Sequence, residues 1–114
     1  MQKELFRDVI EYALQIQLDS EECECMLNLG EYGENLLFVN FINEDEEDYK
    51  INMCEFIVLD KTGGFVENMI IVDNEFDIDV DEDCDEVTHT VEEAFEKFDL
   101  TPRFKSLLEV VNED

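Results

Sequence analysis

The stretch ECECMLNLGEYGENLLFVNFI, residues 22–42, determines how the chain is expected to fold. Over residues 22–29 the pattern has a period of two residues, typical of a β-strand. One face of this strand would carry Cys23, Cys25, Leu27 and Leu29. Residues 30–33 contain two glycines suited to a tight hairpin connection, and residues 36–42 follow as a run that is apolar on both faces. The stretch therefore predicts an antiparallel hairpin whose second strand lies centrally in a sheet.

The sheet is expected to continue after the charged loop at residues 43–48. Residues 49–60 form another apolar run, and Lys61-Thr62-Gly63-Gly64 is predicted to turn the chain back into a strand over residues 65–72. These runs make a four-stranded meander. Beyond it Phe76, Ile78 and Val80 alternate with aspartates, which indicates a short fifth strand or an extended edge arm.

Helical spacing appears on both sides of these strands. Apolar residues recur at intervals of three and four over residues 3–18, which predicts an N-terminal helix. Near the other end, Thr88 or Thr90 is suited to cap a helix that runs to Lys97, and Pro102 suits the first turn of a last helix. We therefore expect an α+β fold, an antiparallel four- to five-stranded meander sheet with one N-terminal helix and two C-terminal helices.

Composition predicts a single folded domain over residues 1–114 with an extreme charge. Thirty-three Asp and Glu face seven Lys and Arg, giving a formal net charge of −26. Such a charge can prevent folding, but 45% of the residues are hydrophobic and nine are Phe, which is ordinary material for a core. Without a signal-like or membrane-spanning apolar run, we expect a cytoplasmic protein with reduced cysteines, in the host cytosol if it is phage-encoded.

The predicted meander gathers the acidic residues at one end. In an antiparallel order, the start of the first strand, the connection after the second strand and the exit of the fourth strand meet at the same end. All three segments are rich in Asp and Glu, whereas the two glycine turns at the opposite end are far less charged. The predicted partner-binding residues are Glu22, Glu24, Glu44, Asp45, Glu46, Glu47, Asp48, Asp73, Glu75, Asp77, Asp79, Asp81, Glu82, Asp83, Asp85 and Glu86.

The segment 73–86 has the densest charge, with nine carboxylates in fourteen positions. From Asp77 to Asp85 an aspartate stands at every second position, so an extended chain would place these carboxylates on one face about 6.6 Å apart. Successive phosphates along one nucleic-acid strand are on the order of 6 to 7 Å apart through space. Such an arm is expected to offer carboxylates to Arg and Lys side chains that normally hold phosphates. The alternative for any single run is a solvated surface without a partner.

Metal and catalytic sites have less support in the sequence. The stretch from Asp77 resembles the opening of a calcium-binding EF-hand loop, but Glu82 and Thr88 stand where that loop needs Gly and a bidentate Glu. Cys23 and Cys25 are better explained as small buried side chains than as half of a zinc site. His89 supports no triad. We expect neither a cofactor nor a dedicated metal site, and no enzymatic activity, although weak divalent binding by the carboxylates stays open.

These features favour an inhibitor that imitates nucleic acid. The partner would be a basic nucleic-acid-binding protein, whereas direct binding of nucleic acid or a membrane is disfavoured by charge repulsion. In size and acidity the chain resembles phage-encoded inhibitors of bacterial defence, among them anti-CRISPR and anti-restriction proteins, without a shared motif. The resemblance implies counter-defence against a CRISPR effector nuclease or a restriction enzyme, as a monomer or homodimer. The alternatives are an immunity protein or antitoxin against a basic nuclease toxin, and a salt-adapted housekeeping domain.

Overall fold

A long amphipathic helix opens the fold. The computed structural model describes residues 2–21, 24–43, 53–76, 78 and 87–111, and helix α1 spans Gln2–Ser20. The residues of α1 that are buried keep the expected spacing of three and four: Phe6, Val9, Ile10, Ala13 and Gln17. Gln17 is polar, but its Nε2 donates a hydrogen bond to the backbone carbonyl of Phe41 at 3.0 Å. This bond ties the last turns of α1 to the sheet.

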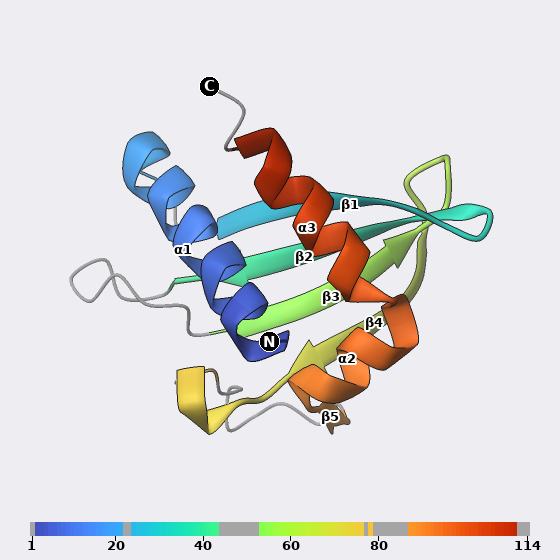
Figure 1. Cartoon of the computed structure of the whole chain (residues 1–114). Coiled ribbons are helices and arrows are strands. Elements are labelled where there is room, and N and C mark those ends of the chain that lie inside the picture. The colour runs from blue at the N-terminus through green and yellow to red at the C-terminus, as the bar shows by residue number, and fades with distance from the viewer. Residues whose placement is uncertain (1, 22–23, 44–52, 77, 79–86, 112–114) are drawn as a thin grey trace.

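Five strands form one sheet in the order β1-β2-β3-β4-β5. The strands are β1 (Glu24–Tyr32), β2 (Asn35–Ile42), β3 (Met53–Leu59), β4 (Phe65–Ile71) and the short β5 (Thr88–His89). β1 to β4 are antiparallel neighbours, whereas β5 pairs with β4 in parallel. Helices α2 (Val91–Phe98) and α3 (Leu100–Val111) follow, so the predicted α+β order of one helix, a mostly antiparallel sheet and two helices is confirmed (Figure 1).

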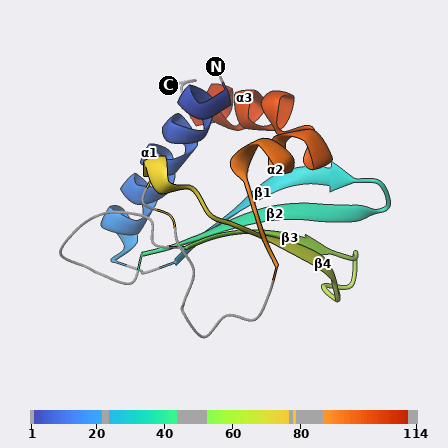
Figure 2. The same ribbon diagram turned by 90° about the horizontal axis from the view of Figure 1, so that it is seen from below.

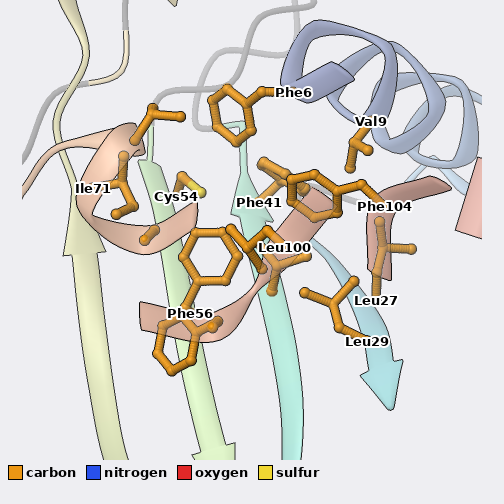
Figure 3. Close-up of a cluster of buried hydrophobic side chains, with 14 of the residues drawn as sticks. Phe6, Val9, Leu27, Leu29, Phe41, Cys54, Phe56, Ile71, Leu100 and Phe104 are labelled. Atoms are coloured by element: carbon orange, nitrogen blue, oxygen red, sulfur yellow. The ribbon is translucent and has the colours of Figure 1, made fainter. Parts of the chain in front are cut away.

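The three helices lie on one face of the sheet (Figure 2). Along most of β1, β2 and β3 every second residue is buried, as in the series Cys25, Leu27 and Leu29 of β1. The centre of this layer is a group of phenylalanines from the helices and the sheet (Figure 3). The ring of Phe104 in α3 lies 6.3 Å from that of Phe6 and 6.4 Å from that of Phe56, measured between centroids. Aromatic and aliphatic burial on this one side therefore provides the driving force for folding.

The fifth strand does not lie where the alternation of Phe76, Ile78 and Val80 predicts it. Residues 74–76 form a 3-10 turn, η1 (Asn74–Phe76), and Ile78 makes a single antiparallel bridge back to Asp73. The Asp73 carboxylate accepts a hydrogen bond from the backbone N–H of Glu75 at 2.9 Å, and such local bonds compete with strand pairing. The predicted fifth strand is therefore wrong at Phe76, whereas residues 77 and 79–81, on which the alternative of an extended edge arm depends, lie outside the described part of the chain.

The ends of the C-terminal helices follow the expected chemistry. Thr90 is the N-cap of α2. Its hydroxyl accepts a hydrogen bond from the backbone N–H of Glu93, and the Glu93 carboxylate accepts one from the backbone N–H of Thr90. Asp99 ends α2 in the left-handed conformation at φ 51° and leads directly into α3. Pro102 lies in the first turn of α3, where a missing N–H costs no helical bond. The hairpin α2–α3 is thus short and sharply turned.

Candidate acidic interaction surface

The strand register brings together the chain segments that flank the acidic runs. Glu24 at the start of β1 lies opposite Ile42 at the end of β2, and Ile42 lies opposite Met53 at the start of β3. The next pair along β3 joins Cys54 to Ile71, the last residue of β4. We call the end of the sheet that contains Glu24, Ile42, Met53 and Ile71 the acidic end. The predicted meander polarity is therefore correct for the described residues.

Most of the predicted partner-binding residues lie outside the described part of the chain. These are Glu22, Glu44, Asp45, Glu46, Glu47, Asp48, Asp77, Asp79, Asp81, Glu82, Asp83, Asp85 and Glu86. The structure describes Glu24, Asp73 and Glu75. Glu24 is exposed on the first residue of β1, and it has exposed acidic neighbours in Asp19 and Glu21 where α1 ends.

Asp73 and Glu75 have partners within the molecule that the sequence pattern did not indicate. The Lys3 Nζ lies 2.7 Å from Glu75 Oε2, 3.7 Å from Asp73 Oδ2 and 3.8 Å from Glu92 Oε1. Arg7 stands one turn further along α1, with its guanidinium 4.0 Å from Glu75 Oε1 and its Cζ 5.4 Å from the centroid of the Phe76 ring. We call these residues the Lys3 cluster.

Within the Lys3 cluster, the positive charge of Lys3 partly neutralises the carboxylates of Asp73 and Glu75. The hydrogen bond from Lys3 lowers the pKa of Glu75, and the same bond raises the pKa of Lys3. The side chain of Asp73 is only 8% exposed, whereas that of Glu75 keeps 48% of its surface in solvent. Of the two, Glu75 is therefore the one whose carboxylate a partner can still reach. Pairing over such a sequence separation has no local signature, so only the fold reveals it.

The opposite end of the sheet has a mixed charge. There Arg103 donates hydrogen bonds to the backbone carbonyls of Leu29 and Glu31, both at 2.7 Å, and so holds the end of β1 against α3. The turn between β3 and β4 contains Asp60, whose carboxylate is bound within the turn, and the exposed Lys61. Glu31 and Glu34 are exposed at the neighbouring hairpin. Acidic and basic side chains therefore both lie at this end.

The described cysteines lie in the core, and the described histidine lies beside a helix cap. Cys25 and Cys54 are buried in the core, and burial raises the pKa of the Cys54 thiol. The ring Nδ1 of His89 lies 2.9 Å from Glu93 Oε2, beside the α2 cap. Within the described residues, no three or more His, Cys, Asp or Glu side chains gather as a metal ion would need. Cys23, Cys84 and most of the stretch resembling an EF-hand loop lie outside those residues.

No described helix is long and apolar enough to cross a membrane. In comparisons with known proteins, the chain matches no family model, no curated protein and no solved structure. What the fold and the surface define is thus a small, strongly acidic α+β protein with its acidic runs attached to one end of a sheet.

Proposed function

We propose that this protein is a nucleic-acid mimic that binds and blocks the DNA- or RNA-binding surface of a bacterial defence protein. The observation that carries the proposal is the register of β1 to β4, because it attaches the flanks of three acidic runs to the same end of the sheet. A net charge of −26 costs a folded domain stability through self-repulsion, so a partner of opposite charge gives the excess a purpose.

The physical basis of binding would be competition for cationic side chains. Arrays of Arg and Lys that hold phosphates would instead pair with carboxylates, most strongly where Arg binds in bidentate geometry. Long-range attraction would steer the encounter, with association rates up to about 10⁸ to 10⁹ M⁻¹s⁻¹ that fall steeply with added salt. A CRISPR effector nuclease is the preferred target, and a restriction enzyme or DNA-repair enzyme is the next.

The first experiment is an affinity pull-down from host lysate at low and at high salt, with and without excess competitor DNA. The expected result is a basic nucleic-acid-binding protein that remains bound at low salt and is displaced by DNA. A specific partner that is indifferent to DNA, or no partner under any condition, contradicts mimicry. A nuclease toxin encoded beside this protein would instead support the immunity-protein alternative.

Neutral replacements test which acids carry the function. Replacing the five acids at residues 44–48 by Asn and Gln, or doing the same for those at residues 77–85, should slow association with the target about tenfold or more at low salt. The fold should be equally or more stable, since like-charge repulsion is reduced. The control at the opposite end is Glu31→Gln with Glu34→Gln, and the effects are compared per charge removed, by stopped-flow binding and thermal unfolding. A larger effect from the control than from either acidic run would overturn the assignment.

A further inference from the structure

One face of the sheet carries no helix of the described residues, yet it is largely apolar. The helices cover the face that contains Cys54 and Phe56, and the alternate residues of the same strands point to the other side (Figure 2). We call this second side the open face. On β1 it includes Met26, which is 51% exposed.

Along the two central strands the open face is built from cross-strand pairs. The register places Leu36 opposite Leu59, Phe38 opposite Ile57, Asn40 opposite Glu55 and Ile42 opposite Met53. All eight side chains are half-buried, and successive pairs along a strand are about 6.6 Å apart. Three apolar pairs thus surround one polar pair. The residues on the solvent-facing side of an antiparallel sheet are ordinarily polar. The apolar side chains on this face therefore indicate a surface that becomes covered.

The polar pair indicates the chemistry of what covers it. The Asn40 Oδ1 is buried and accepts no hydrogen bond from the described residues. Its neighbour Glu55 is a carboxylate whose Oε2 accepts a bond from the Asn68 side chain at 2.6 Å. A partner whose binding reorients the Asn40 side chain and supplies a donor would satisfy this oxygen. Oxygen acceptors and a negative charge in an apolar setting suit a side chain that only donates, such as Arg or Lys.

Charge determines which kind of molecule can cover the open face. A second copy would bring another −26 to the interface, and Glu24 and Glu55 already lie on this face. Like charges brought that close repel each other, and an anionic membrane or a nucleic acid meets the same repulsion. A cationic protein segment with aliphatic or aromatic side chains meets no such repulsion.

We infer that the open face docks a protein segment that combines apolar side chains with Arg or Lys. The apolar side chains of the segment would cover the Phe38–Ile57 pair, and its cationic groups would lie over Glu55 and Asn40. The inference deepens the proposed function, on which the choice of a cationic partner rests. It adds a second contact, since the open face would give shape and apolar burial where the acidic end gives attraction.

The test uses two short peptides of equal charge, one alternating Arg with Leu and the other alternating Arg with Ser. Each is titrated into the ¹⁵N-labelled full chain and followed by NMR. The Arg-Leu peptide should bind at least about tenfold more tightly than the Arg-Ser peptide and shift amide signals of β2 and β3, because burying apolar side chains adds affinity that charge alone cannot. Equal affinities overturn the inference but leave the proposed function standing. Absence of binding by both peptides counts against both.

Variants separate the open face from the acidic end. Ile57→Thr keeps a β-branched side chain in β3 and should remove most of the preference for the Arg-Leu peptide, whereas Val87→Thr at an exposed position away from β2 and β3 should leave it unchanged. If Ile57→Thr fails to fold, Met26→Gln on the edge strand replaces it. Unchanged preference in the folded variant overturns the inference. So does a dimer, detected by sedimentation, that the same substitution abolishes, because the occupant is then a second copy.

Discussion

At the residue scale, the turn between β3 and β4 shows how one carboxylate organises a loop. The Asp60 Oδ1 accepts hydrogen bonds from the backbone N–H and the hydroxyl of Thr62, at 2.9 and 2.6 Å, and from the N–H of Gly64 at 2.8 Å. Gly63 has φ 89°, a conformation that glycine adopts without strain. At Gly64 a Cβ would lie 2.7 Å from Asp60 Oδ2. The backbone conformation at Gly63 therefore favours glycine, whereas a Cβ at Gly64 would require the Asp60 carboxylate to move.

The bonds to Asp60 predict its titration. They lower its pKa below the ordinary 3.8, with the Thr62 hydroxyl as the largest cause. A lowered pKa in the folded state means that the contribution to stability is present above the ordinary pKa and is lost as the pH falls through the lowered one. Thr62→Val should raise the pKa of Asp60 toward its ordinary value, and Thr62→Ser should leave it low. A carboxyl-detected NMR titration measures this, and an unchanged pKa in the valine variant would contradict the assignment.

At the scale of the element, the start of α2 depends on its capping box. Thr90 satisfies the N–H of Glu93, one of the donors that a helix leaves unpaired at its first turn. The same short segment carries His89 of β5, so the cap also fixes the point where the chain leaves the sheet. The helix is only eight residues long and needs such help, because short helices are marginal by themselves.

Thr90→Ala is expected to lower the free energy of unfolding by about 1 kcal/mol, as caps of this type usually contribute. Thr90→Ser keeps the hydroxyl and is the matched control. Urea unfolding of both variants measures the difference. A loss of the same size in the serine variant would show that the threonine methyl group, not the cap, is responsible.

At the scale of the whole molecule, self-repulsion sets the balance of stability. The ion pairs of the Lys3 cluster and the Glu67–Lys97 pair are attractive, but thirty-three acids against seven basic side chains leave most carboxylates without a cation. Exposed ion pairs contribute little. Repulsion should therefore outweigh attraction, so added salt, which weakens both, should stabilise the fold.

Raising NaCl from about 0.1 M to about 1 M shortens the screening length from about 10 Å to about 3 Å. We expect Tm to rise by about 4–8 °C, which corresponds to about 1 kcal/mol for a domain of this size. The increase should be smaller in the variant neutralised at residues 44–48, and KCl should act as NaCl does. Calorimetry measures it, and a Tm that falls with salt would mean that ion pairing dominates.

Sequence by itself determined the α+β class, the order of one helix, a meander and two helices, a helix start near Thr88 or Thr90, and the position of Pro102 in the first turn of the last helix. It also determined the end of the sheet at which the flanks of the acidic runs lie. These follow from local periodicity, from turn chemistry and from the antiparallel order of neighbouring strands. Only the tertiary structure decided that β5 is Thr88–His89, that Lys3 pairs with Glu75, and that one face of the sheet, with Phe38 opposite Ile57, has no described helix over it. Each of these depends on contacts between distant segments, and the sequence near either partner carries no periodic signal for them.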